Sequence, residues 1–179
     1  MNIRMVDTIT QNEHIKSEVD AAVQDVITSG MYINGPTVKR FTENLATYLG
    51  AEKVIPCANG TDALQIALMA LDLKPGDEVI TTPFTFCSTA EVIALLGLVP
   101  VFVDVTDDSY NIATADIEAA ITPKTKAIIP VHLFGQPADM APIMEVANRH
   151  NIYVIEDAAQ SMGADYTMGD GTTIQSGLI

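Results

Sequence analysis

The sequence predicts an α/β fold built around a largely parallel sheet. Runs rich in β-branched residues recur every 22 to 26 residues, starting near Val54, Val79, Val101, Ala127 and Ile152. Stretches with the apolar spacing of helices separate them, at 61–73, 86–97, 114–121 and 139–149. The runs 127–131 and 152–155 are continuously apolar, as in strands that helices cover on both faces. Strand, helix and strand at this spacing are typical of right-handed βαβ units.

Two more helices are expected before the first of these strands. Residues 12–29 carry apolar side chains on one face, Thr10 and Glu13 have the spacing of a capping box, and Gly30 provides a stop. A second helix is predicted from Pro36 to Gly50. We therefore expect an N-terminal helical segment, 1–50, followed by an α/β domain, 51–179.

The charge balance narrows the classes of partner. The chain has 9 Lys and Arg against 23 Asp and Glu, a formal net charge of −14. Such a chain repels nucleic acid and anionic membranes. With no apolar run of about 20 residues and no signal-peptide core at its start, we expect a cytoplasmic protein. Cys57 and Cys87 are expected to be reduced, half-buried thiols, and no Cys/His cluster predicts a metal site.

Ligands of open α/β sheets bind beyond the carboxyl ends of the parallel strands. The residues that follow the predicted strands are therefore the candidates for chemistry. They are Asn59 to Asp62, Phe84 to Phe86, Asp104, His132, and Glu156, Asp157 and Gln160.

Each of these candidates has a functional and a structural interpretation. Gly60 and Thr61 at a helix start suit a phosphate, although a plain N-cap has the same residues. Asp157 follows an apolar strand and needs a cation, a metal ion or several backbone donors. Phe86 can cover a planar ring or simply pack in the core. A lone histidine such as His132 is usually structural, and we assign it no catalytic role.

Several motifs of other enzyme classes are missing from the sequence. No GxGxxG follows a predicted strand, so a dinucleotide-binding oxidoreductase is poorly supported. The P-loop and GxSxG motifs are missing as well.

Four ordered segments resemble the DegT/DnrJ/EryC1/StrS family of sugar aminotransferases. They are 29–36 (SGMYINGP), 57–64 (CANGTDAL), 75–80 (PGDEVI) and 156–161 (EDAAQS), and the resemblance runs from about residue 5 to the end. It implies the large domain of fold type I of pyridoxal phosphate enzymes, with three layers. The run 121–131 is most similar to members that act on a UDP-linked 3-keto N-acetyl hexuronate.

The resemblance also implies an activity and a role for each matched residue. The activity is transamination of a keto nucleotide sugar, with glutamate as donor, for surface polysaccharide, by a homodimer. Gly60, Thr61 and Asp62 would hold the cofactor phosphate, and Phe86 would stack on the pyridine. Asp157 would pair with the ring nitrogen, and Gln160 would reach the phenolic oxygen. Gly30 and Tyr32 would approach the nucleotide sugar.

One part of the family pattern is missing from these residues. The family's Schiff-base lysine follows a Ser-Phe segment beyond the Asp-Ala-Ala-Gln motif, and all six lysines here precede Asp157. We therefore expect an incomplete large domain without the C-terminal small domain, and no lysine-bound cofactor on this chain alone. We also expect the strand near Val54 to lack sheet neighbours, and the isolated chain to be insoluble or poorly cooperative. A dehydratase of the same family and a non-catalytic cofactor- or nucleotide-sugar-binding protein remain the alternatives.

Overall fold

A computed structural model describes residues 6–179, which divide into two compact units. The first unit ends at Pro56 and the second is Cys57–Ile179. No helix among the described residues is long and apolar enough to cross a membrane.

The first unit holds the two predicted helices, α1 (Thr8–Ser29) and α2 (Pro36–Leu49). Its first helix begins earlier than expected, because Asp7 rather than Thr10 is the N-cap. The Asp7 carboxylate accepts the Thr10 N–H at 3.1 Å and the Thr10 hydroxyl at 2.9 Å. The predicted capping box is therefore wrong. Gly30 ends α1 with a φ of 68°, the left-handed conformation that glycine adopts without strain.

The second unit contains a four-stranded parallel sheet in the order β2-β1-β3-β4. Its strands are β1 (Glu78–Thr81), β2 (Val99–Phe102), β3 (Thr125–Ile128) and β4 (Tyr153–Val154). The helices between them are α4 (Ser88–Leu95), α5 (Thr114–Ala120) and α6 (Met140–His150), and α3 (Gly60–Ala70) precedes the first strand.

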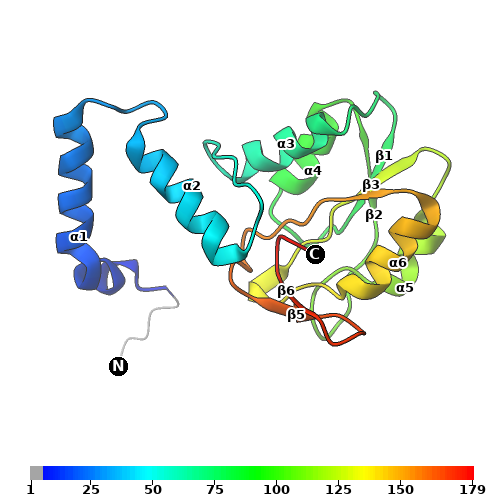
Figure 1. The fold of residues 1–179 in the computed structure, drawn as a ribbon. Helices are drawn as coiled ribbons and strands as arrows, with labels where there is room; N and C mark the ends of the chain where they lie inside the picture. The colour runs from blue at the N-terminus through cyan, green and yellow to red at the C-terminus, as the bar shows by residue number, and fades with distance from the viewer. Residues whose placement is uncertain (1–5) are drawn as a thin grey trace. The chain divides into compact units, whose positions relative to one another are not determined.

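The sheet is covered on both faces, so the unit has three layers (Figure 1). Neighbouring residues of one strand point to opposite faces. Val79 packs with Leu68 of α3 and Val92 of α4, whereas Ile80 packs with Ile117 of α5 and with α6. Each core is closed by helices, which explains the continuously apolar run 127–131. The predicted three-layer α/β fold is confirmed.

One of the five predicted strands, the first along the chain near Val54, is not formed. Residues 51–57 have no strand conformation, and none of the described strands pairs with them. Apolar and β-branched composition is not enough for a strand, because its backbone N–H and C=O groups need a neighbouring strand.

An antiparallel hairpin forms beyond the last predicted strand, in a stretch for which the sequence predicts no strand. β5 (Asp165–Thr167) pairs with β6 (Thr173–Gln175), and the turn between them contains the dipeptide Asp170-Gly171. Asp-Gly between two short runs is a turn signal that the sequence analysis did not use.

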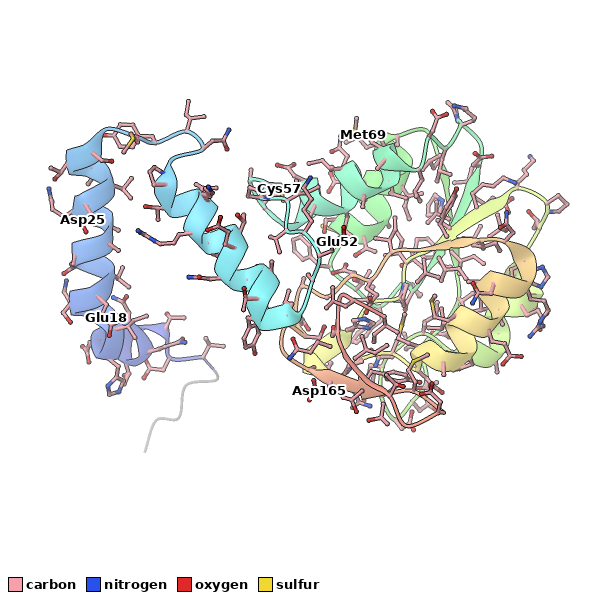
Figure 2. The ribbon with its side chains drawn as sticks, viewed as in Figure 1. Glu18, Asp25, Glu52, Cys57, Met69 and Asp165 are labelled. Atoms are coloured by element: carbon pink, nitrogen blue, oxygen red, sulfur yellow. The ribbon has the colours of Figure 1, made fainter. Side chains whose placement is uncertain are left out.

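Both cysteines are free and exposed, which corrects the expectation of half-buried thiols. Cys57 lies on the irregular segment before α3, where Figure 2 labels it, rather than at the end of a covered strand. Cys87 is the residue just before α4.

Candidate active site

A pocket of about 530 Å³ opens at the carboxyl ends of β1, β3 and β4, beside the start of α3. Its walls come from four segments that lie far apart in the sequence. Five of the six residues predicted to bind the cofactor line it: Gly60, Thr61, Phe86, Asp157 and Gln160. Asp62, the sixth, is not part of its lining.

Backbone pairing with the end of β3 fixes the position of Asp157. Its N–H donates to the Pro130 carbonyl at 2.9 Å, and its own carbonyl accepts the His132 N–H at 3.0 Å. This isolated parallel bridge, Val131 with Asp157, keeps the register of β3 and β4 three residues beyond their last pair, and Asp157 lines the pocket there. The rule that strand ends carry the chemistry therefore predicted the place of this residue correctly.

The Asp157 side chain is 8% exposed and has two hydrogen-bond donors within the chain. Its Oδ2 accepts the hydroxyl of Thr89 at 2.9 Å, and its Oδ1 accepts the Ala159 N–H at 3.3 Å. Among residues 6–179, no cationic side chain forms an ion pair with it. No Lys or Arg lines the pocket either. A nearly buried carboxylate without a cation favours a ligand that brings positive charge.

The first turn of α3 also lines the pocket. Asn59 is its N-cap, and the Asn59 Oδ1 accepts the Asp62 N–H at 2.9 Å. The amides of Gly60 and Thr61 precede this bond and lie at the positive end of the helix. A Cβ at Gly60 would meet no atom within 4 Å, so an anion has room to approach the backbone there.

The Asp62 amide, unlike those of Gly60 and Thr61, already donates a hydrogen bond to the Asn59 side chain. A phosphate that bound it would first have to displace the Asn59 side chain. The proposed role of Asp62 stays a prediction.

Phe86 is 72% exposed and lies on the loop that joins β1 to α4. Core packing, the structural alternative for this residue, therefore does not apply. An exposed ring at a pocket wall is available for stacking.

Gln160 lies across the pocket from α3 and has a defined amide orientation. Its Oε1 accepts the Phe134 N–H at 2.8 Å. Because Oε1 already accepts this hydrogen bond, the Nε2 amide group is the part of the side chain that can donate to an oxygen of a ligand.

His132 is fully buried and its tautomer follows from its two neighbours. Nδ1 accepts the Ala138 N–H at 3.0 Å, so the ring hydrogen must be on Nε2, which lies 2.8 Å from Glu156 Oε2. The ring is thus a neutral donor to Glu156, which agrees with its predicted structural role.

Gly30 and Tyr32 belong to the first unit and do not line this pocket. Gly30 is the C-cap of α1. Tyr32 is 64% exposed, and its hydroxyl donates to the Ile27 carbonyl at 3.3 Å. Their contact with a nucleotide sugar stays a prediction.

Three side chains that shape the site have no role in the sequence analysis, although two of them, Asn59 and Glu156, are among its candidates. The third is Thr89. A signal existed for Asn59, which is a favoured cap residue directly before a helix. No local pattern pointed to Thr89, whose partner Asp157 is 68 residues away.

Comparison with known proteins shows the family of the chain. The model of the DegT/DnrJ/EryC1/StrS aminotransferase family matches residues 13–175. The chain belongs to this family. It is 53% identical over 92% of its length to the UDP-2-acetamido-2-deoxy-3-oxo-D-glucuronate aminotransferase of Pseudomonas aeruginosa, of which it covers 46%.

Solved structures share the fold as well. The chain superposes on DesV of S. venezuelae, solved with a ketimine intermediate, with a TM-score of 0.89 and 38% identity. That match covers 92% of this chain and 44% of DesV. For the E. coli GDP-4-keto-6-deoxy-D-mannose-3-dehydratase with hydrated PLP, the TM-score is 0.76 at 31% identity, over 80% of this chain and 39% of the dehydratase. The chain thus spans less than half the length of these family members.

Proposed function

We propose that this chain supplies the cofactor-binding pocket of a pyridoxal-phosphate-dependent enzyme that transfers an amino group to a keto nucleotide sugar. The observation that carries the proposal is Asp157, a nearly buried carboxylate at the wall of a pocket of about 530 Å³, with no cationic partner among residues 6–179.

The pocket offers a suitable partner for each group of pyridoxal phosphate, which supports the proposal. Gly60 and Thr61 at the start of α3 suit the phosphate, because free N–H groups and the helix dipole attract an anion. Phe86 suits the flat face of the ring, and the Gln160 Nε2 suits its phenolic oxygen. Asp157 suits the ring nitrogen, since a carboxylate in a poorly solvated site favours the protonated form of a nearby base.

The chemistry that the cofactor supplies when bound is an electron sink for the carbon that loses or gains the amino group. This chain's contribution is to hold the proton on the ring nitrogen through Asp157. None of its six lysines lines the pocket. Transamination by residues 1–179 alone is therefore still predicted to fail.

The substrate that we propose is a UDP-linked 3-keto N-acetyl hexuronate, with glutamate as the amino donor. The 53% identity to the Pseudomonas aeruginosa aminotransferase supports this choice. We further propose that Gly30 and Tyr32 contact the nucleotide sugar and that the protein works as a cytoplasmic homodimer in surface polysaccharide synthesis.

Binding of pyridoxamine 5′-phosphate tests the pocket without requiring a lysine. Asp157→Asn removes the charge that faces the ring nitrogen, and we expect the affinity to fall about tenfold or more in a fluorescence titration at pH 7.5. Asp104→Asn is the matched control, because Asp104 is an exposed acid just beyond β2 and outside the pocket. Equal affinity of Asp157→Asn and the unaltered protein would overturn the proposal.

A dehydratase of the same family is the second candidate, favoured by the likeness to the GDP-4-keto-6-deoxy-D-mannose-3-dehydratase. Incubation with a keto nucleotide sugar and glutamate separates the two, provided that the protein assayed also carries the segment expected to hold the Schiff-base lysine. An amino sugar with 2-oxoglutarate supports the aminotransferase, whereas loss of water from the sugar supports the dehydratase. Tight binding without either product supports a non-catalytic binding protein.

A further inference from the structure

Two threonine hydroxyls form a chain of hydrogen bonds that ends on Asp157. Thr89 lies in the first turn of α4 and is fully buried. Its Oγ1 is 2.9 Å from Asp157 Oδ2 and 3.0 Å from the Oγ1 of Thr85, which lines the pocket.

The donor and acceptor of each of these hydrogen bonds follow from the number of hydrogens available. An ionised carboxylate only accepts hydrogen bonds, so the Thr89 hydroxyl must point its hydrogen at Asp157. Each hydroxyl has one hydrogen, so Thr89 accepts from Thr85. The order is therefore Thr85 to Thr89 to Asp157, with no alternative arrangement while Asp157 is charged.

The chain of hydroxyls leaves the two carboxylate oxygens of Asp157 unequal. Oδ2 is committed to the buried Thr89, whereas Oδ1 has only the longer bond from Ala159 N–H at 3.3 Å. We propose that Thr89 is a positioning residue that holds the Asp157 carboxylate so that Oδ1 meets a protonated ring nitrogen, and that Thr85 fixes the direction of the Thr89 hydroxyl. This inference rests on the proposed function.

A purely structural role for Thr89 makes the opposite prediction for two conservative changes. Thr89→Val keeps the shape of the side chain but removes the hydroxyl. Thr89→Ser keeps the hydroxyl but removes a methyl group from a buried site. If Thr89 acts only through packing, Thr89→Val should behave like the unaltered protein and Thr89→Ser should be impaired. If Thr89 positions Asp157, Thr89→Val should lose this role and Thr89→Ser should retain it.

The test measures the affinity of the protein for pyridoxamine 5′-phosphate and for its analogue with CH in place of the ring nitrogen. For the nitrogen-containing ligand we expect a five- to tenfold loss in Thr89→Val and less than a twofold change in Thr89→Ser. For the analogue we expect no difference among the variants, because it has no charged nitrogen to align. Urea unfolding of each variant runs in parallel.

Three outcomes overturn the inference: unchanged affinity in Thr89→Val, an equal loss in Thr89→Ser, or an equal loss for the analogue. If Thr89→Val does not fold, Thr85→Val replaces it, with an expected two- to threefold loss confined to the nitrogen-containing ligand. Asp157→Asn separates the two proposals. Should Asp157→Asn weaken binding while the threonine variants do not, only the positioning role fails; should Asp157→Asn bind normally, the proposed function fails with it.

Discussion

The Nε2 atom of His132 lies 2.8 Å from Oε2 of Glu156, and the carboxylate of Glu156 accepts two further hydrogen bonds from backbone. These come from the Gly177 N–H at 2.8 Å and the Ile179 N–H at 2.7 Å. Glu156 therefore ties the end of β3, the end of β4 and the segment after β6 together. It does so directly beside Asp157, so it stabilises the wall that carries the candidate active-site acid.

Replacement of Glu156 by glutamine is expected to lower the free energy of unfolding by about 1–3 kcal/mol. Three donors converge on this carboxylate, and a glutamine offers one oxygen and one N–H₂ group, so at least one donor is left facing another donor. Urea unfolding followed by circular dichroism measures the loss. Glu91→Gln on the exposed face of α4 is the control, and the same unfolding midpoint in both variants would contradict the role of Glu156.

Substitution of Gly60 by alanine is expected to separate folding from ligand binding. The added Cβ meets no atom within 4 Å, so the free energy of unfolding is unchanged or rises by up to about 1 kcal/mol. The methyl group occupies space in front of the α3 amides, so we expect weaker binding of pyridoxamine 5′-phosphate and unchanged binding of pyridoxamine. Gly169→Ala in the β5–β6 turn, where a Cβ is equally free of contacts, is the control. An equal effect on the ligand with and without phosphate would refute the phosphate site.

Phe86 and Phe84, two residues apart, are expected to respond differently to replacement by leucine. Phe86 is exposed at the pocket, so Phe86→Leu should change the free energy of unfolding by less than about 0.5 kcal/mol. It should weaken pyridoxamine 5′-phosphate binding about three- to tenfold through lost stacking. The ring of Phe84 packs 5.6 Å from that of Tyr110, outside the pocket lining, so Phe84→Leu should lower stability and leave affinity unchanged. Unchanged affinity in Phe86→Leu together with weaker binding in Phe84→Leu would disprove stacking by Phe86.

The environment of Tyr166 predicts that the folded protein loses stability at alkaline pH. Burial, and then the hydrogen bond to the Asp139 carboxylate, raise the pKa of Tyr166 above its ordinary value of about 10. Its contribution is therefore fully present below pH 10 and is lost as the pH rises through the higher pKa of the folded state.

Tyr166→Phe should flatten that alkaline loss in urea unfolding measured from pH 8 to 11. It should also cost about 1 kcal/mol at pH 7, because the Ala141 N–H at the start of α6 loses its acceptor, the Tyr166 hydroxyl, at 3.0 Å. Tyr153→Phe on β4, where the ring is exposed, is the control and should keep the alkaline slope. Identical slopes in Tyr166→Phe and the unaltered protein would contradict the pKa shift.

The amino-acid sequence alone determined the order of helices and strands in the α/β unit and the place of the candidate active site. The spacing of apolar residues indicates which face of a segment is buried. This spacing predicted α3, α4, α6 and the strands β1 to β3. Strand ends then located Phe86, Asp157 and Gln160, because the carboxyl ends of parallel strands share one edge of the sheet. Gly60 follows a predicted strand that does not form, and the start of α3 places it instead.

Only the tertiary structure decided the features that depend on a partner far along the chain. Residues 165–175, for which the sequence predicts no strand, pair with each other through a turn. The Thr89 hydroxyl finds Asp157 across 68 residues, and Glu156 finds Gly177 and Ile179 across 21 and 23 residues. A hydrogen bond needs an approach of about 3 Å in a defined direction, and local periodicity has no information about that distance.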